Sequence, residues 1–252
     1  MRFKNKIIDT IFVYCWTAWS GFAFSMVLIF FFPFFFIGVY IPSKRVRYYL
    51  HFFPQWASKV SLFLLGIKVK IKNQKIIDPL KQYIFVANHR SYLDPLIAAV
   101  SNQNFKKYIG KAEVLKIPVL GFVLKSINVP VIREEKNSRK WSMKKMFEYL
   151  KDGASMVIFP EGTCNTTKNL LKEFKGGAFS LSQQTNIPIA IYTIIGAAEL
   201  MPRSGLLVRP GKIEVVWNEV IYPTDFDHIS FMKMKVQEEI LAILKPIYPE
   251  GY

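Results

Sequence analysis

The stretch "IFVANHRSYLDPLIAAV", residues 84–100, joins two apolar segments through a short polar turn. The run "IFVAN" predicts a short buried strand, and "DPLIAAV" predicts a helix that packs behind it. Pro95 suits the first turn of that helix, where its missing N–H leaves no hydrogen bond unmade. A strand that leads directly into a helix is the building unit of an open α/β sheet. Functional residues of such sheets collect at the carboxyl ends of the strands.

The polar turn contains His89 and, five positions later, Asp94, and this spacing admits two interpretations. Ser91 and Asp94 match the S-x-x-D capping box, in which the aspartate satisfies main-chain donors at the helix start and His89 has no function. Alternatively, the Asp94 carboxylate accepts the Nδ1–H of His89, which fixes the tautomer of the ring and leaves Nε2 free as a base. Asp94 can do both, so the two interpretations are compatible.

No protein nucleophile accompanies this pair in the sequence. The chain has no G-x-S-x-G motif, and Cys15 lies inside an apolar run. A histidine–aspartate pair without a nucleophile indicates that the substrate supplies the reacting hydroxyl group. The three histidines and two cysteines also lack the spacing of metal ligands, so the sequence predicts no metal site.

Length and charge narrow the class of partner. The 252 residues suit one domain of ordinary to large size, with room for an appendage, and 51% of them are hydrophobic. The net charge is +16, which suits a nucleic acid, an anionic lipid surface or an anionic substrate. Cys15 and Cys164 lie in very different contexts and indicate no disulfide framework, so a reducing, cytoplasm-facing protein is expected.

The N-terminal segment favours lipid among these partners. No charged residue occurs between Thr10 and Ser43, and a single helix of that run would reach roughly 50 Å, against a hydrocarbon core of about 30 Å. Basic residues flank both ends, which favours both ends on the cytoplasmic face. We therefore expect two helices that dip into the membrane and return, with a turn near Gly21 or a break near Pro33. A single tilted span is the alternative.

The remaining sequence alternates predicted strands and helices. Residues 44–66, which include His51, mix aromatic, basic and apolar residues, as a segment in the lipid headgroup layer does. A strand with one wet face follows at 67–73, and an apolar helix is expected across 112–126. The pattern predicts an α/β fold with a mixed, largely parallel sheet flanked by helices, preceded by the membrane-embedded two-helix segment. The predicted domains are a membrane-associated segment, 1–66, and an α/β domain, 67–252.

Two further strand ends carry candidate site residues. "VPVIR" ends on Arg133, which can grip a phosphate, although a solvated arginine beside two glutamates is the simpler interpretation. "VIFP" leads into Glu161, Gly162 and Thr163. A buried Glu161 can hold the guanidinium of Arg133 or bond a substrate hydroxyl, and Gly162 lets the backbone approach a ligand closely. We expect these loops and the His89 turn to share one edge of the sheet.

Four blocks of the sequence, in order, resemble the glycerolipid acyltransferases of the lysophosphatidate acyltransferase (PlsC) type. The resemblance covers roughly residues 60–195, and the apolar N-terminal segment also fits. The blocks are "NHRSYLD" (88–94), "GKAEVLKIPVLGFVLKSINVPVIR" (110–133), "FPEGT" (159–163) and "IPIAIY" (187–192). The H-x4-D pattern alone is weak, but its combination with "VPVIR" and "FPEGT" is specific.

The resemblance implies a reaction and roles for the residues. A membrane-bound enzyme of this type moves an acyl group from acyl-CoA or acyl-ACP to the free sn-2 hydroxyl of lysophosphatidate, without a further cofactor. His89 corresponds to the general base, Asp94 to its orienting partner and Pro188 to a position beside the acyl site. The residues that correspond to acceptor-binding positions are Lys111, Arg133, Glu161, Gly162 and Thr163. The implied partners are an anionic membrane surface, a lysophospholipid and the acyl donor. The implied location is the cell membrane, with the active site on its cytoplasmic side.

One departure from the family pattern keeps the acceptor open. The family usually continues "FPEGT" with arginine and serine, whereas this chain has Cys164 and Asn165. A lyso-ornithine or lyso-glycine lipid is therefore an alternative acceptor, and a lysine at 168, 172 or 175 can replace the missing charge. A non-catalytic basic membrane-binding protein is a third hypothesis. Nucleic acid is not expected, because the sequence carries no helix-turn-helix, zinc-finger or RNP-like signature.

Overall fold

The short apolar runs of the sequence form the strands of one mixed sheet. The computed structural model describes residues 5–40, 52–117, 119–132, 135–202 and 205–252. In these residues seven strands pair in the order β1-β7-β6-β2-β5-β3-β4. The strands are β1 (Ile67–Lys72), β2 (Ile84–Val86), β3 (Lys106–Lys111), β4 (Asn128–Val131), β5 (Ser155–Ile158), β6 (Ile189–Ile195) and β7 (Gly211–Ile221).

Five neighbouring strands of the sheet run parallel and bring their carboxyl ends to one edge. β6, β2, β5, β3 and β4 are parallel, whereas β7 is antiparallel to β6 and carries β1 parallel to itself. This confirms the predicted α/β fold with a mixed, largely parallel sheet. β2 and β5 are adjacent, with Phe85 level with Val157. The turn that follows β2 and the loop that follows β5 therefore leave the sheet side by side, as the sequence predicts.

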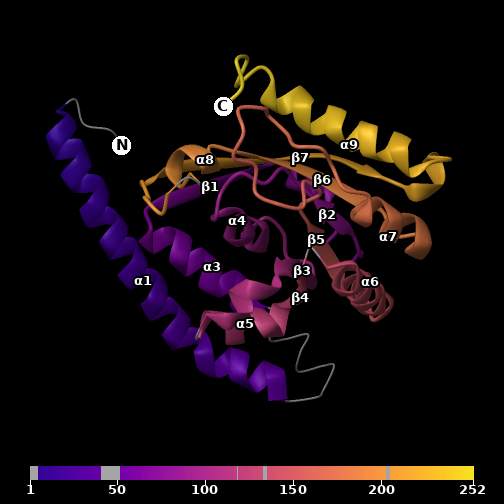
Figure 1. Ribbon diagram of the computed structural model, residues 1–252, viewed down its shortest axis with the longest axis horizontal. Coiled ribbons are helices and arrows are strands. Elements are labelled where there is room, and N and C mark those ends of the chain that lie inside the picture. Colours follow the sequence, from indigo (N-terminus) through magenta and orange to yellow (C-terminus); the bar gives the residue numbers. More distant parts are fainter. Residues whose placement is uncertain (1–4, 41–51, 118, 133–134, 203–204) are drawn as a thin grey trace.

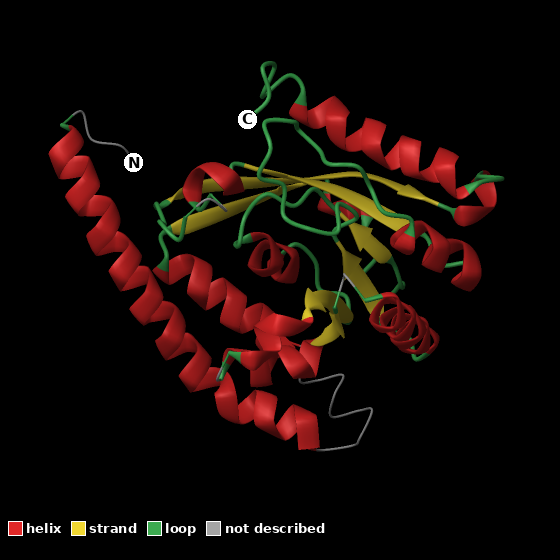
Figure 2. Cartoon of the chain, in the orientation of Figure 1, coloured by secondary structure: helices red, strands yellow, loops and turns green. Residues whose placement is uncertain are grey.

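Helices cover both faces of the sheet (Figure 1; Figure 2). One face packs against α3 and α4, and the other packs against α6, α7 and α9. The side chains of β2 alternate between the two helical layers. Phe85 faces the α3/α4 side, while Ile84 and Val86 face the α6/α7/α9 side. The helices are α1 (Lys6–Tyr40), α3 (Phe52–Leu64), α4 (Asp94–Val100), α5 (Leu120–Ile127), α6 (Lys136–Lys151), α7 (Gly177–Thr185), α8 (Ala197–Leu200) and α9 (Ile229–Leu244), with 3-10 turns at Gln74–Ile76, Ala112–Lys116 and Pro223–Asp225.

The N-terminal segment forms one continuous helix, which corrects part of the prediction. Helix α1 runs through both Gly21 and Pro33, so neither the turn expected near Gly21 nor the break expected near Pro33 is present. A glycine inside a helix costs only about 1 kcal/mol, and a proline often bends a helix without ending it. By length and composition, Lys6–Phe36 is also the one helix in the described ranges that is apolar enough to cross a membrane.

Contacts along its length compensate these local costs and hold α1 against the rest of the molecule (Figure 1). The indole N–H groups of Trp16 and Trp19 donate to main-chain carbonyls at the end of α3. Asp9 forms an ion pair with Arg209 at 2.6 Å, and Phe32 packs against Phe122 of α5 with ring centroids 5.1 Å apart. Tertiary packing therefore overrides the local signals for a turn.

Two other predictions need adjustment. The apolar helix expected across 112–126 is divided into the 3-10 turn Ala112–Lys116 and α5, with an extended Ile117 between them. The residue before a proline avoids the helical region, and Ile117 precedes Pro118 in the sequence. Within the segment 44–66, the structure describes residues 52–66, while residues 44–51, including His51, lie outside the described residues.

Candidate active site

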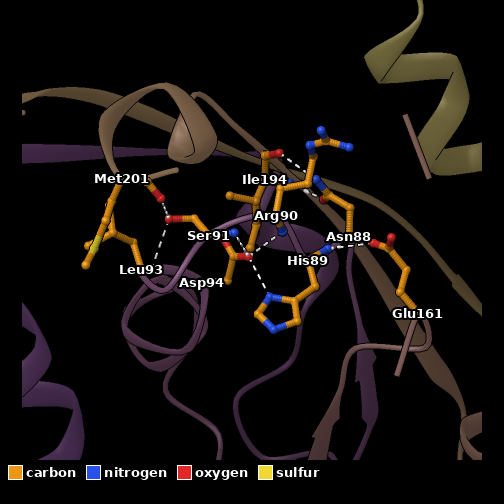
Figure 3. A network of polar contacts seen from close by, with 9 residues as sticks. All are labelled: Asn88, His89, Arg90, Ser91, Leu93, Asp94, Glu161, Ile194 and Met201. Atoms are coloured by element: carbon orange, nitrogen blue, oxygen red, sulfur yellow. Dashed lines mark hydrogen bonds and ion pairs between the residues drawn. The ribbon is translucent and has the colours of Figure 1, made fainter. Parts of the chain in front are cut away.

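The turn after β2 brings His89 and Asp94 into direct contact (Figure 3). The Nδ1 atom of His89 lies 2.7 Å from Oδ2 of Asp94, the first residue of α4. The Asp94 side chain is 1% exposed and the His89 side chain 14%. A nearly buried carboxylate favours a proton on Nδ1, which leaves Nε2 as an acceptor. In Figure 3 the Nε2 edge of the ring points away from Asp94, where a substrate hydroxyl could approach.

The Asp94 carboxylate also organises the main chain of the turn. Its Oδ2 atom accepts the N–H groups of Arg90 at 2.7 Å and Ser91 at 2.8 Å. The predicted capping box does not form, because Leu93 is the N-cap of α4 and no side chain caps this helix. The Ser91 hydroxyl instead accepts the N–H of Leu93 and donates to the carbonyl of Met201. The Asp94 carboxylate therefore orients His89 and holds the preceding turn together, rather than capping α4.

These bonds determine which main-chain donors are available to a reaction. The N–H of His89 donates to Glu161 Oε1 at 2.8 Å, and those of Arg90 and Ser91 donate to Asp94. Main-chain donors around residues 87–91 are the obvious candidates for stabilising an oxyanion, but in this turn the N–H groups of 89, 90 and 91 are engaged by carboxylates. The sequence could not reveal this, because the acceptor for His89 lies 72 positions away.

An aromatic ring supports the imidazole from the neighbouring strand end. Phe159, directly after β5, stacks on the His89 ring with centroids 4.4 Å apart and planes at 20°. The stack and the bond to Asp94 restrain the ring in two directions. Sequence reasoning did not single out Phe159, although it is the first residue of the quoted "FPEGT" block. The parallel pairing of β2 with β5 is the fact that places it beside His89.

Glu161 braces the same loops through its carboxylate. Its Oε1 atom accepts the N–H of His89 and its Oε2 atom accepts the N–H of Lys172 at 2.9 Å, while the residue is 2% exposed. Burial raises the pKa of the Glu161 carboxyl above its usual range, and the two N–H donors oppose that rise. Both oxygens bind main chain, so the observed contacts give Glu161 a role in shaping the loop.

Two asparagines complete the main-chain connections of the His89 turn. The side-chain amide of Asn88 bonds both the carbonyl and the N–H of Ile194, which extends the β2–β6 pairing by one further step. The N–H of Asn165 donates to the carbonyl of His89 at 2.6 Å. The buried Asn165 side chain bonds Thr167 and Asn169 within its own loop. Asn165, which departs from the family pattern, therefore has a structural role.

Arg90 fastens the loop that follows Glu161. Its guanidinium donates to the carbonyl oxygens of Thr167 and Asn169, both at 2.7 Å. The ring of Tyr252 lies against the other side of the group, with the ring centroid 3.7 Å from Cζ. The N–H of Tyr252 donates to the carbonyl of Lys168 at 3.0 Å. These contacts form a clamp that joins the His89 turn, the loop after β5 and the C-terminal residue Tyr252. No local sequence pattern predicts it.

Of the remaining predicted site residues, the structure describes Lys111, Gly162 and Thr163. Lys111 ends β3, which lies two strands from β2 with β5 between them, about 10 Å across the sheet. Its ammonium lies 3.4 Å from Glu113. Gly162 has φ of +70°, which favours glycine, and Thr163 is exposed. Arg133 lies outside the described residues.

The two cysteines and the acidic and histidine side chains are the possible ligands for a metal in the described part of the chain. Cys164, at the position where the resemblance leads one to expect arginine, is buried, and Cys15 is exposed in α1. The structure forms no group of three or more His, Cys, Asp or Glu side chains suited to a metal ion within the described ranges. The dyad itself can exchange a proton with a substrate hydroxyl through Nε2.

Comparison with known proteins identifies the family of the chain. A family model described as "Acyltransferase" matches residues 68–195, just over half of the chain. A probable 1-acyl-sn-glycerol-3-phosphate acyltransferase of Mycoplasma genitalium is 30% identical over 205 residues, which cover 76% of this chain and 73% of the relative. The 1-acyl-sn-glycerol-3-phosphate acyltransferase of Bacillus subtilis is 30% identical, with 69% of this chain and 83% of the relative covered.

A plant relative and a solved structure complete the comparison. A chloroplastic 1-acyl-sn-glycerol-3-phosphate acyltransferase of Brassica napus is 32% identical over 146 residues, and the chain spans about two fifths (42%) of its length. The crystal structure of the 1-acyl-sn-glycerophosphate acyltransferase PlsC from Thermotoga maritima has the same fold. Its TM-score is 0.82 at 22% identity, with 94% of this chain and 97% of that chain covered. The match of the family model over 68–195, together with the 30% identity to a relative covered over most of its length, shows that the chain belongs to the PlsC-type 1-acyl-sn-glycerol-3-phosphate acyltransferase family.

Proposed function

We propose that the protein transfers a fatty acyl group from an acyl thioester to the sn-2 hydroxyl of lysophosphatidate, which yields phosphatidate. The observation that carries this proposal is the His89–Asp94 contact of 2.7 Å at the carboxyl edge of the sheet, in a chain of this family. The acyl donor is acyl-CoA or acyl-ACP. The proposed catalytic domain is 67–252, and residues 1–66 are the proposed membrane-associated segment.

The geometry supports direct attack by the acceptor. Nε2 of His89 accepts the proton of the acceptor hydroxyl as its oxygen bonds to the thioester carbonyl carbon, and a tetrahedral intermediate forms. The intermediate collapses with cleavage of the C–S bond, and the imidazolium returns the proton to the departing thiolate. The negative charge on Asp94 stabilises the imidazolium between these steps. Holding both substrates at one surface adds to the rate, because their encounter becomes effectively intramolecular.

The acceptor pocket is assigned to the loops at the same edge. We assign Lys111 and Arg133 to the acceptor's phosphate, and Gly162 and Thr163 to the wall of the pocket. Glu161 contributes by holding that wall, because its carboxylate bonds the main chain of both His89 and Lys172. Arg133 follows β4 in the sequence, and β4 is the neighbour of the strand that ends at Lys111.

Helix α1 supports a location at the membrane surface. Exposed apolar side chains recur along the whole length of α1, mostly three to five residues apart, and Phe52, Trp56 and Phe63 of α3 add to them. Both ends of α1 contact the rest of the molecule, through Asp9 and through Phe32. This supports a helix that lies in the interface rather than one that crosses the bilayer. The exposed side chains of α1 include Ile7, Ile11, Tyr14, Trp19, Phe22, Met26, Ile29, Phe30, Phe36 and Tyr40.

The net charge of +16 fits an anionic membrane surface as partner. Basic residues flank the apolar helix on both sides in the sequence, which supports the cytoplasmic side of the cell membrane. Sedimentation with vesicles tests this part of the proposal. Replacing Phe22, Ile29 and Phe30 with serine should reduce sedimentation with anionic vesicles, whereas unchanged binding would contradict an interfacial α1.

The reaction is tested with the purified full chain in detergent. Labelled acyl-CoA and acyl-ACP are offered to lysophosphatidate and to lyso-ornithine and lyso-glycine lipids, beside the His89→Ala variant. We expect transfer to lysophosphatidate that falls about a hundredfold or more in the variant. Transfer only to an aminolipid would replace the proposed acceptor. Equal rates in both proteins, or no transfer by folded protein, would contradict the proposed chemistry.

A further inference from the structure

The loop that follows β5 is attached to the His89 turn at two points. Glu161 accepts the N–H of His89 at 2.8 Å, and the N–H of Asn165 donates to the carbonyl of His89 at 2.6 Å. Thr163 lies midway between these attachments, two residues from each, which is at most about 8 Å of chain. Its side chain is exposed. The Thr163 hydroxyl is therefore presented to solvent close to the catalytic turn.

Lys172 approaches this hydroxyl from the far side of the loop. Its N–H donates to Glu161 Oε2 at 2.9 Å, which places its main chain, and its Nζ atom donates to Thr163 Oγ1 at 2.8 Å. Within the described residues no carboxylate forms an ion pair with this ammonium. An ammonium carries three donors and a hydroxyl carries one. Two N–H groups of the Lys172 ammonium and the O–H of Thr163 therefore remain as hydrogen-bond donors for a ligand at this position.

The donor set at this point suits a phosphate monoester. Such a group carries about −1.5 to −2 charge at neutral pH and presents three acceptor oxygens. In the acceptor, the reacting hydroxyl and the phosphate are separated by two carbons and one ester oxygen, so a phosphate site must lie close to His89. Lys172 meets that condition through the contacts with Glu161 and Thr163. Lys111, assigned above to the same phosphate, begins two strands away beside Glu113, so it would reach that phosphate from across the sheet edge.

We propose that Lys172 and Thr163 bind the phosphate of the acceptor, and that Lys172 sets the preference for a phosphate-bearing lysolipid over a neutral one. This inference rests on the proposed function and deepens it. It assigns to residue 172 the positive charge that position 164 lacks, because Cys164 is buried while the Lys172 ammonium reaches the exposed Thr163. Glu161 thus has a second effect, since it holds the main chain of both His89 and Lys172.

The test compares Lys172→Met with Lys168→Met in the full chain. Lys168 lies on the same loop, and its side chain has no hydrogen bond or ion pair with another described residue, so the control removes the same charge. Steady-state rates are measured with 1-acylglycerol 3-phosphate and with neutral 1-acylglycerol. We expect Lys172→Met to raise KM for the phosphate-bearing acceptor roughly tenfold to hundredfold, with little change in kcat or in KM for the neutral acceptor. Lys168→Met should change neither, and Lys172→Arg should largely retain the parent KM.

Direct binding of glycerol 3-phosphate by calorimetry separates this inference from the proposed reaction. Weaker binding by Lys172→Met than by Lys168→Met supports the site even if no transfer is detected. Conversely, transfer to the phosphate-bearing acceptor with an unchanged KM in Lys172→Met would overturn the site and leave the proposed reaction standing. Equal losses for both acceptors would also overturn it, because they would show a structural role. Thr163→Val should give a smaller increase in KM in the same direction.

Discussion

Replacing Asp94 with asparagine or with alanine separates the two roles of this carboxylate. Asp94 Oδ2 accepts from His89 Nδ1 and from the N–H groups of Arg90 and Ser91. Alanine removes all three bonds, whereas asparagine leaves one side-chain oxygen that can face the same donors. The alanine variant therefore loses stability as well as chemistry, and the asparagine variant loses mainly the negative charge.

The expected changes in the free energy of unfolding follow from the burial of the two main-chain N–H donors. Arg90 and Ser91 are 7% and 0% exposed, so their N–H groups have no access to water as a substitute acceptor. Each buried donor left unpaired costs about 1–3 kcal/mol, so Asp94→Ala should lower the free energy of unfolding by about 2–6 kcal/mol. Asp94→Asn should cost about 1–2 kcal/mol, because the bonds persist without charge assistance. Its kcat should fall by about 10² to 10⁴, because nothing stabilises the imidazolium.

Release of free thiol from acyl-CoA measures the rates, and urea unfolding followed by circular dichroism measures the stabilities. Asp94→Asn should unfold at a urea concentration between those of the parent and of Asp94→Ala, while losing most of its activity. A parent-like rate in Asp94→Asn would refute the role of Asp94 as partner of His89. A parent-like stability in Asp94→Ala would refute its role as acceptor for the turn.

Three further predictions concern the residues around the dyad. Phe159→Leu should lower kcat up to about tenfold by removing the stack on His89, and Phe159→Tyr should retain it in steady-state assays; equal rates in all three proteins would contradict the positioning role. Burial raises the pKa of Glu161 from its unfolded value of about 4.3, so the native state binds more protons between the two pKa values. Its contribution to the free energy of unfolding should therefore fall as pH rises through that window, and Glu161→Gln should remove this component in unfolding titrations. Tyr252→Ala should weaken the clamp on Arg90 by about 0.5–2 kcal/mol, seen as faster proteolysis of loop 163–172, whereas Tyr252→Phe should match the parent; no difference between the two would refute the clamp.

Most elements of the α/β domain could be predicted from local pattern. Continuous apolar runs bounded by turn residues predicted β2, β4 and β5, and alternation predicted β1, because burial on one or both faces imposes these patterns directly. Strand ends were also predictable, and with them the shared edge of the sheet. The antiparallel direction of β7 was not, since strand order and direction depend on pairing between segments far apart in the chain.

The N-terminal helix shows the limit of local signals. Gly21 and Pro33 each lower the intrinsic stability of a helix, so a turn or break was a reasonable expectation. Contacts with α3 and α5, which no window of sequence contains, keep α1 continuous instead.

By itself the sequence determined the contact at the centre of the proposed site: a histidine followed five positions later by an aspartate at a strand-to-helix turn already predicts their hydrogen bond, because one turn of chain brings the two groups together. Tertiary structure alone decided what surrounds that base. The stacking of Phe159, the brace of Glu161 and the approach of Lys172 to Thr163 depend on contacts between β2, β5 and the loop that follows. Such contacts are set by which strands become neighbours, and neighbouring in a sheet is a property of the whole chain.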